Sequence, residues 1–106
     1  MDTRQTVVVV TGAGSGMGRE TALLFSQKDY TIVGVDINEA TLKETIERTG
    51  QNKDKALGIP ADVTKVEELK TVAEKLRARF GRLDILINCV GQFAAQRDYW
   101  NSATRT

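Results

Sequence analysis

The sequence predicts an α/β fold, with helices on both faces of one doubly wound parallel sheet. Three times along the chain, a short apolar segment precedes a segment of helical periodicity, and a fourth apolar segment follows. This alternation favours parallel strands joined by right-handed helical crossovers. With 106 residues, the chain has room for one domain.

The first strand and the first helix are predicted on either side of a glycine-rich stretch. Four consecutive valines make residues 6–10 a β-branched run, which is typical of a strand buried on both faces. After the glycines, residues 15–28 have a helical pattern whose apolar positions include Met17, Ala22, Leu24 and Phe25. A second apolar strand is predicted over residues 30–36.

The second helix is predicted from its two ends. Asn38 is a suitable N-cap, Leu42 and Ile46 form an apolar stripe at i,i+4 spacing, and Gly50 follows the last turn. A third, weaker strand is predicted over residues 55–60. The proline that ends this strand cannot donate to a ladder, so the strand belongs at a sheet edge.

A third helix and a fourth strand complete the predicted elements. Thr64 and Glu67 have the spacing of a capping box, which predicts the start of a long helix. The predicted apolar face of that helix consists of Val66, Leu69, Ala73, Leu76 and Phe80. Residues 82–88 form the fourth apolar strand.

Composition excludes several classes of function. The chain has no histidine, which rules out catalysis by Ser-His-Asp or Cys-His groups and zinc sites with histidine ligands within these residues. A single cysteine forms no internal disulfide, and the longest apolar run is four valines. The net charge of +1 gives no reason to expect nucleic acid or a membrane as partner. We expect a cytoplasmic protein without a metal site.

The glycines at 12, 14, 16 and 18 follow the first strand and open the first helix. The general dinucleotide pattern G-x-G-x-x-G fails here, because Met17 stands where the third glycine would be. The spacing from Gly12 to Gly16 and Gly18, preceded by Thr11, fits a known variant with the same physical needs: an unusual turn and a close backbone approach to a pyrophosphate. A glycine-rich turn that binds nothing is the alternative.

Asp36 ends the second strand, 18 residues after Gly18. A carboxylate at this place can accept hydrogen bonds from the adenosine ribose. It would also repel a 2′-phosphate, and neither Ser15 nor Ile37 supplies a cation beside it. Arg19, at the start of a helix, is expected to face solvent. The pattern therefore predicts binding of NAD in preference to NADP.

The chain resembles the short-chain dehydrogenase/reductase family from residue 6 to residue 91. The resemblance rests on TGAGSGMG at 11–18, on Asp36, on ADV at 61–63 and on NCVG at 88–91, which is similar to the family's N-N-A-G motif. It implies a Rossmann-like sheet in the order 3-2-1-4, with Asp62 near the adenine. The expected cofactor-binding residues are Gly12, Ser15, Gly16, Met17, Gly18, Asp36, Ile37, Asp62, Val63, Asn88, Val90 and Gly91.

The family's catalytic Tyr-x-x-x-Lys pair has no match in this sequence. Gly34 stands four residues after Tyr30, and Ala103 stands four residues after Tyr99. Residues 1–91 are thus expected to be the NAD-binding half of an oxidoreductase that is truncated after the fourth strand, and residues 92–106 a tail without predicted structure. A full-length form would move a hydride between NAD and an alcohol or carbonyl substrate. The chain alone is expected to be inactive, with no catalytic residues.

Two further expectations follow from the sequence. A non-catalytic nucleotide-binding or interaction module stays open as the alternative function. The fourth strand is apolar on both faces and lacks the lysine, proline or bulge that protects natural edge strands. Self-association through residues 83–88 is therefore expected, and lysine at Ile85 or Ile87 is expected to oppose it.

Overall fold

The computed structural model describes residues 5–90, in which four strands alternate with three helices. The elements are β1 (Val7–Thr11), α1 (Gly16–Gln27), β2 (Thr31–Asp36), α2 (Glu39–Thr49), β3 (Ala56–Pro60), α3 (Val66–Arg79) and β4 (Ile85–Asn88). The strands form one parallel sheet in the order β3-β2-β1-β4. The predicted fold class, strand order and edge position of β3 are confirmed.

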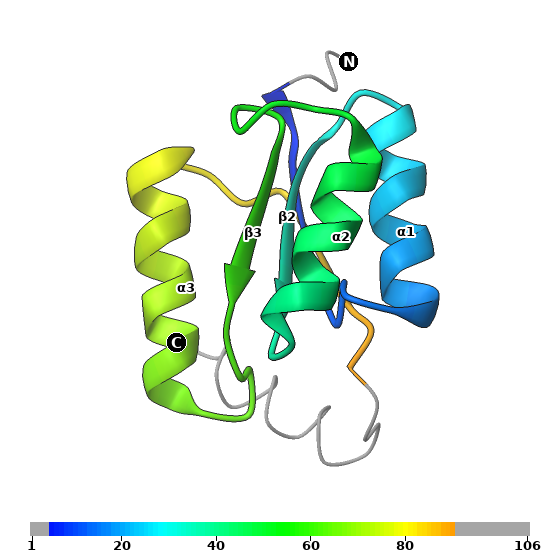
Figure 1. Ribbon diagram of the computed structural model, residues 1–106. Coiled ribbons are helices and arrows are strands. Elements are labelled where there is room, and N and C mark those ends of the chain that lie inside the picture. The colour runs from blue at the N-terminus through cyan, green and yellow to red at the C-terminus, as the bar shows by residue number, and fades with distance from the viewer. Residues whose placement is uncertain (1–4, 91–106) are drawn as a thin grey trace.

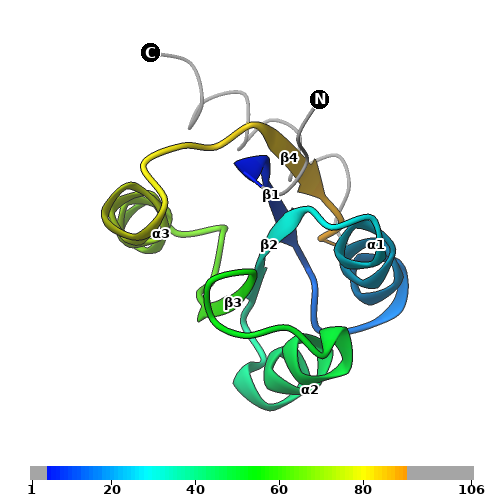
Figure 2. The ribbon, with the colours of Figure 1, turned by 90° about the horizontal axis from the view of Figure 1, so that it is seen from above.

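Helices cover both faces of the sheet. Figures 1 and 2 show α1 and α2 on one face and α3 on the other. All four valines of β1 are buried, and they alternate between two cores. Val7 and Val9 pack in the core on the α3 side, and Val8 and Val10 pack in the core beneath α1 and α2. The valine run is therefore a strand buried on both faces, as predicted.

The predicted ends of α2 are confirmed in detail. The Asn38 side chain accepts a hydrogen bond from the Thr41 N–H at 3.1 Å, which satisfies one of the free donors at the start of the helix. Gly50 ends the helix in the left-handed region with φ of 69°. These caps fix the direction in which the chain leaves β2 and returns to β3.

The capping box predicted for α3 is wrong. The N-cap is Lys65, and it makes no side-chain cap hydrogen bond. The Thr64 hydroxyl instead donates to the Asp62 carboxylate at 2.6 Å. The helix begins one residue later than the capping box requires, so Thr64 precedes the N-cap and its side chain forms a local turn with Asp62 in place of a cap.

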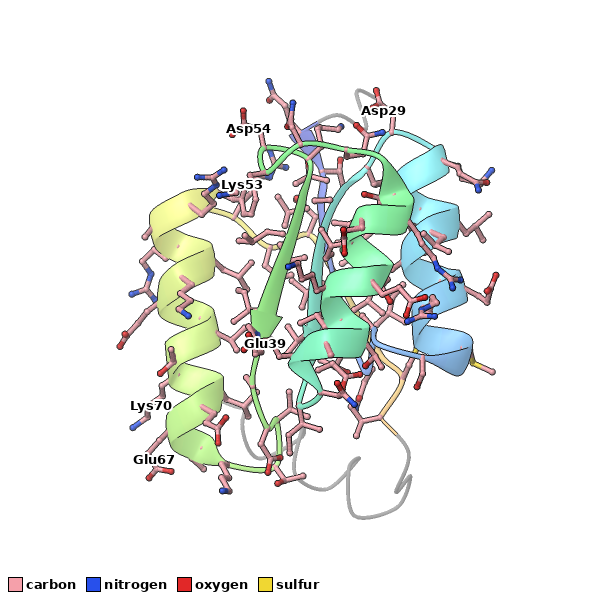
Figure 3. All side chains as sticks on the ribbon, viewed as in Figure 1. Asp29, Glu39, Lys53, Asp54, Glu67 and Lys70 are labelled. Carbon is pink, nitrogen blue, oxygen red and sulfur yellow. The ribbon has the colours of Figure 1, made fainter. Side chains whose placement is uncertain are left out.

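The predicted apolar face of α3 is right in part. Leu76 is buried and Leu69 and Phe80 are partly buried, but Val66 is 50% exposed and Ala73 is exposed as well. Val72 takes the place of Ala73, since the larger side chain buries more apolar surface against the sheet. The charged side chains labelled on α3 in Figure 3 point away from the sheet, as expected for a solvated face.

Asp84 ties the start of β4 to the start of β1. Its carboxylate accepts hydrogen bonds from the Val7 N–H and from Arg82 Nε, both at 2.8 Å, and its own N–H donates to the Val7 carbonyl. The hydrogen bonds from Arg82 and Val7 lower the pKa of Asp84 below its usual range. A group with a lowered folded-state pKa stabilises the fold above its unfolded pKa and stops doing so as pH falls through the folded value.

We therefore expect Asp84→Asn to lower the urea midpoint at neutral pH. The difference from the unmodified chain should shrink as pH falls below the ordinary aspartate range, about 3.9. Asp54→Asn is the control, because that carboxylate is 86% exposed and pairs only with Arg79 among the described residues. A midpoint difference for Asp84→Asn that does not change with pH would contradict this role for the carboxylate.

Candidate cofactor site

An open cleft lies at the carboxyl ends of the strands and has a volume of about 390 Å³. It sits where the strand order reverses, with β2 and β3 on one side of β1 and β4 on the other. In open α/β sheets, ligands bind at such a switch point. The lining residues are Gly12, Ser15, Gly16, Met17, Val35, Asp36, Ile37, Ala61, Asp62, Val63, Cys89 and Val90.

The glycine turn between β1 and α1 forms one wall of the cleft. Gly12 and Gly16 have φ of 70° and 55°, a region that side chains other than glycine rarely adopt. A Cβ on Gly12 would lie 2.8 Å from the Cys89 carbonyl oxygen, whereas a Cβ on Gly16 would meet nothing within 4 Å. Gly16 therefore presents bare backbone to open space at the start of a helix, where N–H groups favour an anion.

Gly18 has a packing role beneath the turn. A Cβ there would clash with the Gly12 carbonyl oxygen, so its absence lets α1 approach the end of β1. Gly18 does not line the cleft. Of the four glycines, Gly12 and Gly16 therefore set the turn, and Gly18 sets the distance between helix and strand. Gly14 leaves room for the Asp36 carboxylate, which a Cβ would approach to 2.8 Å.

Asp36 lies at the edge of the cleft, where β2 ends. Its Oδ2 accepts a hydrogen bond from the Gly14 N–H at 2.8 Å, and its Oδ1 accepts one from the Asn38 N–H at 2.9 Å. The carboxylate therefore joins the glycine turn to the start of α2. A carboxylate has about four lone-pair positions, so acceptor capacity remains for a ligand.

Asp62 and two exposed apolar side chains, Met17 and Ile37, also line the cleft. Hydrogen bonds from the Thr64 hydroxyl and N–H lower the pKa of Asp62, so it is ionised at neutral pH. Met17 is 77% exposed and Ile37 is 72% exposed. Large apolar side chains at the mouth of a cleft offer contact surface to a flat ligand ring.

Asn88 holds two strand ends together. Its side-chain oxygen accepts a hydrogen bond from the Thr11 hydroxyl at 2.7 Å and one from the Val90 N–H at 3.2 Å. It does not line the cleft. Of the cofactor-binding residues predicted from sequence, the cleft brings nine together; Gly18 and Asn88 support it, and Gly91 lies outside the described residues.

The expectation that Arg19 faces solvent is wrong. Its side chain is only 14% exposed and lies between the glycine turn and α2. The sequence analysis also missed three residues that line the cleft: Val35, Ala61 and Cys89. Each of them lies at or beside the carboxyl end of a strand, and that position was the available signal.

Residues 5–90 offer neither a metal site nor a membrane-spanning helix. No group of three or more His, Cys, Asp or Glu side chains there could hold a metal ion. Across the same range, no helix has the length and apolarity needed to cross a membrane.

Comparison with protein families decides the family. The family sequence model that is described as short chain dehydrogenase matches residues 6–104 of this chain. This chain belongs to the short-chain dehydrogenase family. A curated relative, the probable oxidoreductase EphD of Mycobacterium tuberculosis, is 43% identical over 86 residues, which cover 81% of this chain and 14% of the relative.

Solved structures of the family have the same fold. A short-chain dehydrogenase from Bacillus anthracis matches with a TM-score of 0.80 and 28% identity, covering 95% of this chain and 43% of the other. A 3-ketoacyl-(acyl-carrier-protein) reductase from Brucella melitensis, solved as a complex with NADH, matches with a TM-score of 0.70 and 33% identity, covering 76% and 32%. The chain thus spans less than half the length of each of these short-chain dehydrogenases.

Proposed function

We propose that the cleft binds NAD and that the chain supplies the cofactor-binding part of an oxidoreductase acting on an alcohol or carbonyl. The observation that carries this proposal is that the bare backbone of Gly16 at the start of α1 and the Asp36 carboxylate line the same cleft. A dinucleotide carries a pyrophosphate, which the Gly16 backbone would bind, and ribose hydroxyls, which would donate hydrogen bonds to Asp36. NAD would supply the hydride acceptor, and residues of this chain would hold and orient it.

The residues present fit each part of that cofactor. The Gly12 and Gly16 backbone would face the pyrophosphate, and Asp36 would accept hydrogen bonds from the adenosine ribose. The adenine would lie between the exposed Ile37 side chain and the segment of Asp62 and Val63. The NADH complex of the Brucella relative supports a nicotinamide cofactor for this family member.

NAD is proposed over NADP on electrostatic grounds. The described residues that line the cleft include two aspartates and neither a lysine nor an arginine. A 2′-phosphate would bring about two negative charges to the Asp36 carboxylate without a cation to offset them. Arg19, the nearest cation along the turn, is committed to backbone carbonyls on the far side of the turn.

The proposed function is tested by mapping where NAD binds. In amide ¹H–¹⁵N spectra of the chain, NAD should shift the signals of Gly12 to Gly18, Asp36 and Asp62 while leaving those of residues 73–79, the second half of α3, unchanged. These signals serve as the internal control because residues 73–79 do not line the cleft, whereas Glu68 in the first turn of α3 is hydrogen-bonded to Asp62. Shifts confined to other surfaces, or none at millimolar NAD, would refute the proposal.

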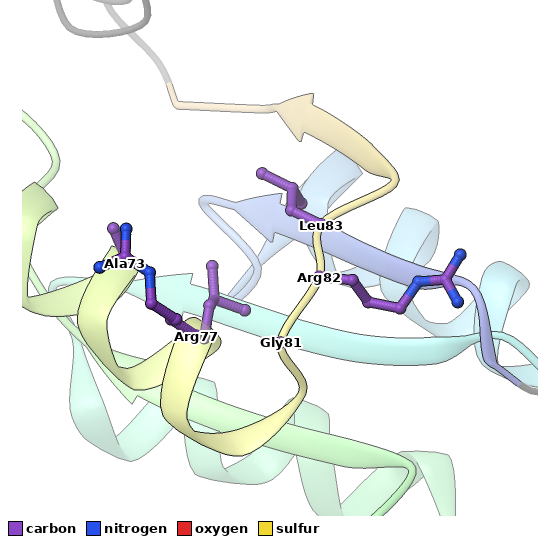
Figure 4. A pocket seen from close by; sticks show the side chains of 6 residues that line it. Ala73, Arg77, Gly81, Arg82 and Leu83 are labelled. Atoms are coloured by element: carbon purple, nitrogen blue, oxygen red, sulfur yellow. The ribbon is translucent and has the colours of Figure 1, made fainter.

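We also propose that this chain self-associates through β4. Among residues 5–90, β4 pairs with β1 alone, and Leu83 and Leu86 are 48% and 37% exposed beside it. A groove of about 200 Å³ between α3 and the turn that leads into β4 adds further apolar surface (Figure 4). Unpaired strand edges with exposed apolar side chains favour pairing with another chain.

Lysine at Leu86 should shift the chain toward monomer in size-exclusion chromatography with light scattering. Leu86 is a better position than Ile85 or Ile87, because those two side chains pack partly into the core beneath α1. Leu24→Lys is the matched control, since Leu24 is a leucine of similar exposure, 52%, that belongs to α1 and not to a strand. A monomeric unmodified chain at micromolar concentrations would contradict the proposed association.

A further inference from the structure

A polar network lies beneath the glycine turn, on the side that faces α2. Arg19 donates to the Gly14 carbonyl at 2.8 Å, to the Thr41 carbonyl at 3.1 Å and to the Thr45 hydroxyl at 2.9 Å. Thr45 is fully buried, and its hydroxyl donates to the Ala13 carbonyl at 2.8 Å. One arginine and one threonine thus hold two successive carbonyls of the turn.

These contacts fix the directions of the N–H groups in the same peptides. A trans peptide is planar, and its N–H points opposite to its C=O. The peptide between Ala13 and Gly14 is held at both ends, by Thr45 at its carbonyl and by Asp36 at its N–H. In the next peptide, Arg19 holds the Gly14 carbonyl on the side of α2, so the Ser15 N–H turns the other way.

We propose that Arg19 and Thr45 are positioning residues that aim the Ser15 N–H and the start of α1 at the pyrophosphate of the cofactor. This inference rests on the proposed function of the cleft. The two side chains lie outside the lining of the cleft, so they act through the turn. They also keep the two carbonyl oxygens away from a phosphate, which those oxygens would repel.

The network continues to the surface through an ion pair. Glu44 lies 3.4 Å from Arg19 and 2.6 Å from Arg48, measured from carboxylate oxygen to guanidinium nitrogen. Arg48 therefore shares Glu44 with Arg19 but, among the described residues, makes no hydrogen bond or ion pair with the turn itself. The side chains of Arg48 and Glu44 are both half exposed. This makes Arg48 a matched control for the loss of an arginine and of its ion pair.

The test compares Arg19→Met and Arg48→Met in two measurements. Without cofactor, Arg19→Met should shift the amide signals of Gly14 and Ser15, and Arg48→Met should not. In ligand titrations, Arg19→Met should lose about tenfold in affinity for NAD, equal to ~1.4 kcal/mol, while its affinity for adenosine, which has no pyrophosphate, stays the same. Arg48→Met should bind both ligands as the unmodified chain does.

A second pair of variants covers the case in which Arg19→Met fails to fold. Thr45→Val removes the buried hydroxyl and should weaken NAD binding. Thr45→Ser keeps the hydroxyl and should bind NAD as the unmodified chain does. Unchanged Gly14 and Ser15 signals, or equal losses for NAD and adenosine, would overturn the positioning role. If Arg19→Met shifts the Gly14 and Ser15 signals but the unmodified chain binds no NAD, the proposed function is refuted. The role of Arg19 in ordering the turn would stand in that case.

Discussion

Gly16→Val should reduce NAD affinity by at least about 100-fold, equal to ~2.7 kcal/mol. The new side chain would project into the open space over the turn, where the pyrophosphate is proposed to lie. It would also place a β-branched residue at φ of 55°, which strains the backbone by about 1–2 kcal/mol. Isothermal titration calorimetry with NAD measures the loss.

Gly50→Val is the control for the backbone strain that Gly16→Val introduces. Gly50 has φ of 69° and, like Gly16, would place its Cβ within 4 Å of nothing, but it caps the far end of α2. Both variants should lose similar stability in urea, and Gly50→Val should keep its NAD affinity. Equal loss of NAD affinity in the two variants would show that strain, not obstruction of the cleft, explains the effect.

Asp36→Ala should weaken NAD binding by about tenfold, the loss expected for a hydrogen bond to a charged group. The variant also frees the N–H groups of Gly14 and Asn38, which the carboxylate binds in the fold. Asp36→Asn separates these effects, because an amide keeps one acceptor oxygen and removes the negative charge. We expect both variants to raise NADP affinity relative to NAD. A ratio that stays the same in Asp36→Asn would contradict repulsion of the 2′-phosphate.

Much of this fold could be predicted because its signals are local. Four valines before a glycine turn predicted β1, and Asn38 and Gly50 predicted both ends of α2. The place of the cleft could also be predicted, because the strand ends and the glycines are visible in the sequence. The switch point follows from the strand order.

The predictions that were wrong concern features that depend on tertiary contacts. Val72 and Ala73 are adjacent on α3, and which of them faces the sheet depends on the rotation of the helix. The place of Arg19 at the start of α1 predicted a solvent-facing side chain, but two of its partners, Thr41 and Thr45, belong to α2, 22 to 26 residues further along the chain. Periodicity within one helix carries no information on such a partner.

The measurement that tests the central claim most directly is calorimetric titration of the unmodified chain with NAD and, separately, with NADP. NAD should bind at one site per chain, and NADP should bind at least about tenfold more weakly, a difference of ~1.4 kcal/mol. Equal affinities for the two cofactors, or no heat of binding with either, would contradict a cleft in which the glycine turn holds a pyrophosphate and Asp36 holds the ribose.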